Sequence, residues 1–119
     1  MANAPNFAIS SDREIRKYIL VLQWPATSEA DFDALISMEE ALLQSDLLGP
    51  YSIVDGHDFG AGEMNIFIHT DQPLEAFQHA MTSLATNRRW VSVRAAYRPI
   101  DGERFVVVWP KELEVFSMR

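Results

Sequence analysis

The spacing of apolar residues constrains the fold of this chain most strongly, because it changes from two to 3.6 residues and back again twice. In residues 17–24, the even-numbered and the odd-numbered positions would point to opposite faces of a strand, and both sets are largely apolar. This pattern is typical of a central strand buried on both faces. Pro25 ends this strand, and Ser28 followed by Asp31 resembles the capping box that begins a helix. The sequence therefore predicts a strand and then a helix.

Two helices are predicted from apolar stripes at helical spacing. The first is centred on residues 35–42, and Gly49-Pro50 ends the segment. The second begins at Pro73, a residue that suits the first helical position, and is predicted to end near Asn87. The stripe of the first helix consists of Phe32, Leu35, Ile36, Leu42 and Leu43, and that of the second of Leu74, Phe77, Met81 and Leu84.

Strands are predicted between and after the helices. Residues 51–57 and 64–69 form a hairpin with a glycine-containing connection, and residues 90–98 and 104–109 form another. The order β-α-β-β-α-β-β predicts an α+β fold. Its first six elements match a ferredoxin-like arrangement, two helices on one face of an antiparallel sheet, with an extra C-terminal strand. We expect a single domain over residues 1–119, with residues 1–11 as a loose leader.

Composition excludes several classes of protein. The chain has no cysteine, which excludes disulfides and thiolate metal sites. No apolar run approaches the roughly 18 residues of a membrane span. Residues 1–11 lack the pattern of a secretory signal, so we expect a cytoplasmic protein.

Charge is strongly segregated along the chain. Residues 18–87 contain eleven acidic residues and no Lys or Arg, and the formal net charge of the whole chain is −7. Such an acidic balance argues against binding to nucleic acid or to an anionic membrane. Two interpretations remain, a solvated acidic face that maintains solubility and a docking surface for a basic protein.

The hairpin around Gly60 carries the least generic chemistry. Its glycines do not fit the common phosphate-binding spacings, and His57 and His69 are predicted to lie too far apart to share a zinc ion. Asp58 and Glu63 are predicted to lie nearly opposite each other across the turn, where paired carboxylates could perform acid-base chemistry or bind a hard cation. Such a pair is more often a solvated turn, so we expect no metal and no cofactor.

A mixed polar and apolar surface is predicted on the sheet face that the helices leave open. Asn65, Phe67 and His69 share that face, but no basic-aromatic RNA-binding motif accompanies them. The candidate binding residues there and on the hairpin are Asp55, His57, Asp58, Glu63, Asn65, Phe67 and His69. No catalytic residue is predicted, because no nucleophile motif is present.

The open face needs cover from a second chain or from the termini. We expect a homodimer joined through apolar strand surface. Its candidate contacts are Phe67, Trp90, Val106 and Val108. The alternative is intramolecular cover by Phe7, Ile9 and Phe116.

The sequence from Asp55 to Ile68, DGHDFGAGEMNIFI, resembles a signature of small uncharacterised bacterial proteins. Some of those proteins are similar to immunity proteins of polymorphic toxin systems. The resemblance implies a non-enzymatic binding protein, an immunity-like inhibitor of a basic protein partner. The alternatives are a small enzyme or ligand sensor that uses the open sheet face and the Asp58/Glu63 turn, and a purely structural dimerising domain.

Overall fold

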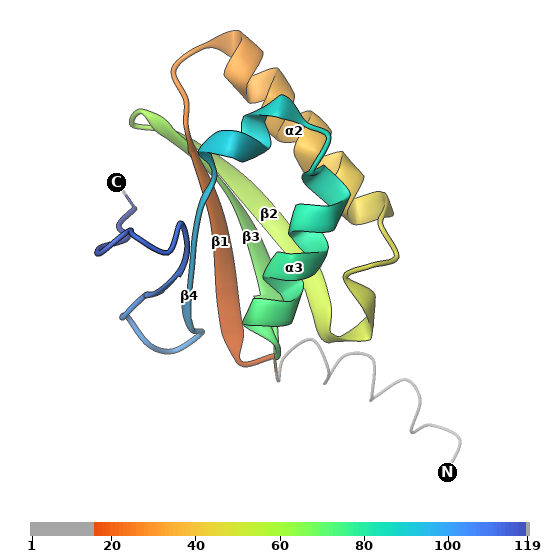
Figure 1. The fold of residues 1–119 in the computed structure, drawn as a ribbon, viewed down its shortest axis with the longest axis vertical. Coiled ribbons are helices and arrows are strands. Elements are labelled where there is room, and N and C mark those ends of the chain that lie inside the picture. Colours follow the sequence, from red (N-terminus) through yellow and green to blue (C-terminus); the bar gives the residue numbers. More distant parts are fainter. Residues whose placement is uncertain (1–15, 119) are drawn as a thin grey trace.

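The computed structural model of the chain describes residues 16–118, a five-stranded antiparallel sheet with two helices packed on it (Figure 1). The strand order is β2-β3-β1-β4-β5, so β1 lies at the centre and β2 and β5 at the edges. The strands are β1 (Tyr18–Pro25), β2 (Ser52–Gly60), β3 (Glu63–Thr70), β4 (Arg94–Pro99) and β5 (Val106–Trp109). The helices are α2 (Glu29–Gln44) and α3 (Pro73–Leu84), with short 3-10 helices η1 (Gly49–Tyr51) and η2 (Arg88–Ser92).

The α+β class, the antiparallel sheet and both helices are confirmed. The fifth strand continues the sheet past β4, so the topology is not a clean ferredoxin-like one. β5 is also shorter than predicted, because it begins at Val106 rather than at residue 104. Among the described residues, no helix has the length and apolar character to cross a membrane. The predicted leader, residues 1–11, lies outside the described residues.

Two predicted boundaries after the second helix were wrong. α3 ends at Leu84 rather than near Asn87, and Trp90 lies in η2 rather than at the start of a strand. The physical reason is a local cap, because the side-chain oxygen of Asn87 accepts a hydrogen bond from the Arg89 N–H group at 2.8 Å. Side-chain to backbone bonds of this kind compete with a continued helix or strand.

α2 begins with the predicted capping box. Ser28 Oγ accepts a hydrogen bond from the Asp31 N–H group at 3.1 Å. Asp31 Oδ2 accepts hydrogen bonds from the backbone N–H groups of Thr27 at 2.8 Å and Ser28 at 3.1 Å, and its other carboxylate oxygen pairs with Arg89 of η2. The Thr27 N–H group and the Arg89 guanidinium are the main reasons that the pKa of the Asp31 carboxyl lies well below its usual range.

The main core lies between the sheet and the helices. On β1, Leu20, Leu22 and Trp24 are buried against this layer. α2 packs over β2 and β3, and α3 packs over β1 and β3. Leu35 and Leu42 of α2 are buried, as the helical stripe predicts.

We predict that Asp31→Asn lowers the midpoint of thermal unfolding at pH 7, because it removes a carboxylate that caps α2 and pairs with Arg89. The pKa of Asp31 is lower in the folded chain than its ordinary value of 3.8, so the ionised carboxyl stabilises the fold above that pH. The difference in midpoint between the natural chain and the variant should therefore shrink as the pH falls below 3.8. Asp33→Asn, an exposed change on the same helix, is the control. A difference that does not depend on pH would show that this charge is not the cause.

Candidate functional site

The sheet face opposite the helices brings together most of the sequence-predicted site residues. Directly paired residues of neighbouring strands point to the same side of a sheet, and here they form three rows across β3, β1 and β4. The rows are His69–Ile19–Arg98, Phe67–Val21–Ala96 and Asn65–Gln23–Arg94. The middle row is apolar, and each outer row carries polar side chains.

The C-terminal segment, residues 110–118 after β5, covers the middle row. Val21, Ala96 and Phe116 are buried together on this side of the sheet. Partly buried side chains complete the cluster, namely Ile19, Phe67, Phe105, Val107, Leu113 and Met118. Of the expected intramolecular contacts, Phe116 is therefore confirmed, while Phe7 and Ile9 lie outside the described residues.

A buried polar network occupies the row that contains Gln23. The Gln23 side-chain amide donates to Asn65 Oδ1 at 3.1 Å, to Glu63 Oε2 at 3.3 Å and to the Ser117 carbonyl at 3.1 Å. Arg94 Nη2 donates in turn to Gln23 Oε1 at 2.6 Å. Gln23, Glu63 and Asn65 are all buried. These contacts give Glu63 and Asn65 a structural role, because they tie β1, β3 and β4 to the C-terminal segment.

The turn of the β2–β3 hairpin follows Gly60 directly. Gly60 pairs with Glu63 and Asp58 pairs with Asn65, so the connection is Ala61-Gly62. Ala61 has a φ of 56°, a left-handed conformation that is uncommon for residues other than glycine. Asp58 is exposed whereas Glu63 is buried, so the two carboxylates stand in different environments.

The two histidines of the candidate set lie on opposite faces of the sheet. His57 Nδ1 lies 2.9 Å from Glu39 Oε1 of α2, and its ring contacts Phe32 on the helix side. His69 Nε2 lies 3.4 Å from Asp55 Oδ2 on the other side. Among residues 16–118, no group of three or more His, Cys, Asp or Glu side chains is arranged to hold a metal ion.

A hollow of about 280 Å³ remains open beside the C-terminal segment. Ile19, Phe67 and Met118 give it apolar walls, and the His69–Asp55 pair and Arg98 line it as polar groups. The Arg98 Nη1 group is bound to the carbonyls of residues 99, 100 and 102, which fixes the guanidinium in place. An apolar hollow with a few fixed polar groups is the usual form of a small-ligand site.

A second surface, which we name the α2–β2 surface, was only partly predicted. It runs from the outer side of α2 and the connection after it to the edge strand β2. Asp58 of β2 pairs with Asn65, so its side chain lies on the side of this edge that faces away from α2. The exposed acidic side chains of the surface are Asp33, Glu40, Asp46 and Asp58, and its exposed apolar side chains are Phe32, Leu43, Leu47 and Tyr51. Phe32 and Leu43 were expected in the buried stripe of the helix, but their exposed fractions are 38% and 60%, respectively. The reason is that β2 is the edge strand on that side, so no further strand among residues 16–118 extends the sheet beneath the outer side of α2.

The four residues expected at a dimer contact lie on different faces. Phe67 packs with the C-terminal segment, whereas Trp90 and Val108 pack against the core on the helix side. Val106 is 49% exposed on the edge strand β5. Only Val106 is therefore well placed to meet another chain.

Comparison of the chain with protein-family models, curated proteins and solved structures found no match.

We predict that Gln23→Met destabilises the fold by about 1–3 kcal/mol for each buried polar partner left without a hydrogen bond. The substitution keeps the length of the side chain but removes the amide that joins Asn65, Glu63 and Arg94. Urea unfolding measures the effect, and Gln44→Met at the exposed end of α2 is the matched control. Equal stability of the two variants would show that the network contributes nothing.

Proposed function

We propose that this protein is a non-enzymatic binding protein that docks a basic protein on its α2–β2 surface. The observation that carries the proposal is the mixture of exposed carboxylates and exposed large apolar side chains along an open strand edge. Asp33, Glu40 and Asp58 have no Lys or Arg partner among the described residues. Large apolar side chains within a charged surround are typical of protein interfaces, and the uncompensated charge favours a basic partner.

The edge of β2 adds a means of recognition. This nine-residue strand pairs with β3 on one side, and no strand among residues 16–118 pairs with it on the other. An open strand edge can accept a strand of a partner through backbone hydrogen bonds. Acidic side chains on a strand edge discourage pairing with neutral or acidic strands. The acidic side chains near the β2 edge therefore favour a partner strand that carries basic side chains.

The resemblance to immunity proteins supports a narrower form of the proposal. The segment that carries it, residues 55–68, includes most of β2, so it contributes directly to the α2–β2 surface. An immunity-like inhibitor would act by covering the active surface of a basic toxin. The alternative of a small enzyme or ligand sensor is favoured by one observation, the hollow between His69 and Arg98.

We predict that the triple variant Asp33→Asn/Glu40→Gln/Asp58→Asn binds the partner about tenfold more weakly, since each exposed charge pair contributes up to about 1 kcal/mol. The measurement is capture from the native host at low salt, followed by the affinity of the purified partner. The matched control is Asp101→Asn/Glu103→Gln/Glu112→Gln, which removes three exposed charges outside the surface.

The proposal expects a basic partner that the natural chain and the control retain and that high salt releases. If that partner arrests growth when expressed alone, the natural chain should relieve the arrest and the triple variant should not. Equal retention by the natural chain and the triple variant, or a partner without a basic surface, would contradict the proposal.

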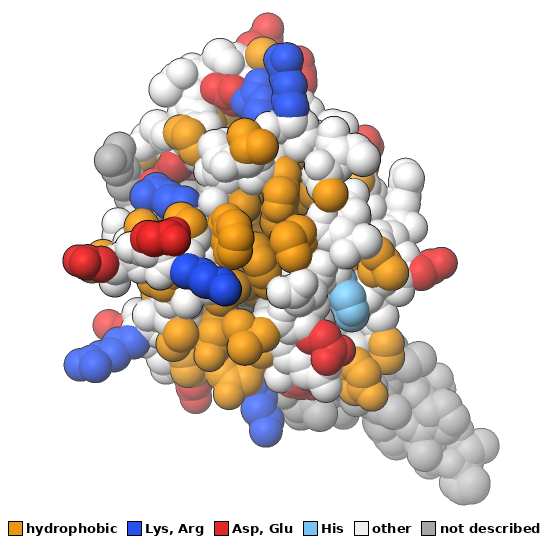
Figure 2. All heavy atoms as spheres, in the orientation of Figure 1, with side chains coloured by type: hydrophobic (Ala, Val, Ile, Leu, Met, Phe, Trp, Pro, Cys, Tyr) orange, Lys and Arg blue, Asp and Glu red, His pale blue; other side chains and the backbone are white. Residues whose placement is uncertain are grey.

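Self-association through β5 is a second proposal. The favouring observation is that β5 forms the other edge of the sheet with Val106 49% exposed and Trp109 38% exposed. The Trp109 ring stacks on the Phe77 ring of α3, with the two ring centroids 6.2 Å apart. Figure 2 shows apolar side chains gathered beside α3 in the middle of the view. Antiparallel pairing of β5 with its copy would extend the sheet and cover these side chains.

We predict that Val106→Asp converts the dimer to a monomer in sedimentation experiments at micromolar concentration, because the charge enters a symmetric contact twice. Val106 is more suitable than Phe67 for this test, since Phe67 packs within its own chain. Val91→Asp, at a residue that is 90% exposed, should leave the dimer intact. A natural chain that sediments as a monomer ends this proposal.

A further inference from the structure

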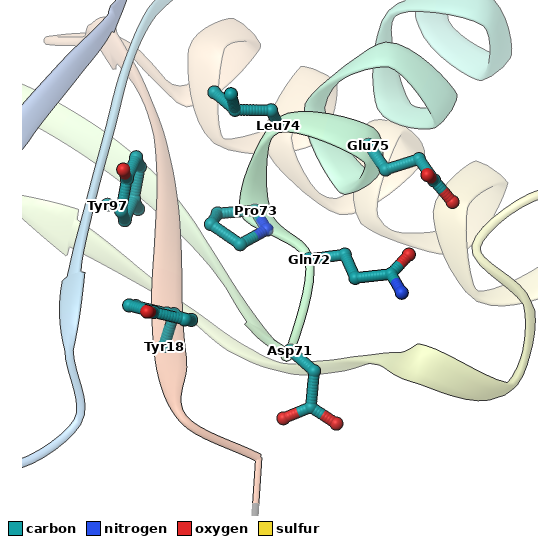
Figure 3. A pocket seen from close by; sticks show the side chains of 7 residues that line it. All are labelled: Tyr18, Asp71, Gln72, Pro73, Leu74, Glu75 and Tyr97. Atoms are coloured by element: carbon teal, nitrogen blue, oxygen red, sulfur yellow. The ribbon is translucent and has the colours of Figure 1, made fainter.

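A hollow of about 360 Å³ lies where the start of β1 and the end of β4 meet the first turn of α3 (Figure 3). Tyr18 and Tyr97 form one wall, with ring centroids 5.5 Å apart in an edge-to-face arrangement. Pro73 and Leu74 line the side that α3 contributes. The hollow therefore has aromatic walls from the sheet and aliphatic walls from the first turn of α3.

A carboxylate stands at the mouth of this hollow. Asp71 Oδ1 accepts a hydrogen bond from the Lys17 N–H group at 3.1 Å, and the Asp71 N–H group donates to the Tyr51 carbonyl at 3.2 Å. These two bonds fix Asp71 between the beginning of β1 and the residue before β2. Its second carboxylate oxygen has no hydrogen-bond partner among the described residues.

An adjoining hollow of about 500 Å³ shares Tyr18 and Asp71 and adds Tyr51 and Lys17. Three tyrosines thus border two neighbouring hollows that have Asp71 in common. Glu75 lines the first hollow as well, although its side chain extends to the far side of α3 from the two tyrosines (Figure 3). Lys17 is the only cationic residue that lines either hollow among the described residues, and it is exposed.

We propose that this place, which we name the tyrosine site, binds an organic cation, a guanidinium or alkylammonium group. The faces of tyrosine rings attract cations through their quadrupole, and the free oxygen of Asp71 can accept a hydrogen bond from the same cation. The apolar walls fit the methylene groups that carry such a cation. An arginine or lysine side chain of a peptide has all of these features.

The charges at the site disfavour an anion. The N-terminus of a helix attracts anions in general, but at α3 the carboxylates of Asp71 and Glu75 already stand there. The inference goes beyond the proposed docking function, because the tyrosine site shares only Tyr51 with the α2–β2 surface. A small cation can therefore be tested without a protein partner.

The experiment is an NMR titration of the full chain with N-acetyl-arginine N-methylamide and, separately, with the lysine analogue. We expect saturable shifts at the amides around Tyr18, Asp71 and Tyr97. The citrulline analogue is the neutral control, because it has nearly the shape of the arginine compound without its charge. Binding of both cations would support a general cation site, and binding of arginine alone would support one that selects guanidinium.

Variants test the assigned roles. Asp71→Asn should weaken the binding of the arginine compound about two- to fivefold. The substitution removes the negative charge but keeps the side-chain oxygen that accepts a hydrogen bond from the Lys17 N–H group. Tyr51→Leu should weaken the binding by a similar factor, because it removes one aromatic ring that could contact the cation. Tyr51 is 53% exposed, so the substitution should leave the fold intact. Lys17→Gln should strengthen binding, since it removes the one competing cation. Asp101→Asn, an exposed change elsewhere, should have no effect.

Equal shifts with the citrulline and arginine compounds would overturn the proposal, as would no shift at the site with either cation. An affinity unchanged by Asp71→Asn would also overturn it. The triple variant of the α2–β2 surface leaves Asp71 intact, so failure of the docking proposal and failure of this one give different results.

Discussion

The central strand β1 is buried on both of its faces. Leu20, Leu22 and Trp24 face the helices, while Val21 and Gln23 face the C-terminal segment, and all five are almost completely buried. Two helices can cover only one face of a sheet, so the other face needs a second layer. Phe105 and the C-terminal segment, through Leu113, Phe116 and Met118, supply that layer within the same chain.

This second layer determines what the candidate site residues can do. Gln23 must be fully bonded because it lies on a strand that water does not reach. Glu63 and Asn65 supply two of the acceptors, so their side chains help to hold the fold together. Further along the same face the cover is incomplete, and there His69 and Arg98 still border an open hollow.

The segregated charge has a parallel consequence. The Arg89–Asp31 pair joins η2 from the basic end of the chain to the start of α2. Within residues 16–118, Asp33, Glu40 and Asp58 form no ion pair with a Lys or Arg, and residues 18–87 contain no Lys or Arg at all. Net negative charge is therefore left on the outer side of α2 and on the β2 edge. This arrangement sets the chemistry of any partner that meets that side.

The element types, the antiparallel class and the acidic block follow from the amino-acid sequence, because hydrophobic period, capping residues and charge are local properties of the chain. Asn65, Phe67 and His69 could be placed on one face, since strand side chains alternate. Packing between distant segments was needed to show that Phe116 covers that face, that Phe32 and Leu43 remain exposed, and that Tyr18, Tyr51 and Tyr97 approach Asp71. Those contacts join residues far apart in the sequence, and no local pattern specifies which distant segments will meet.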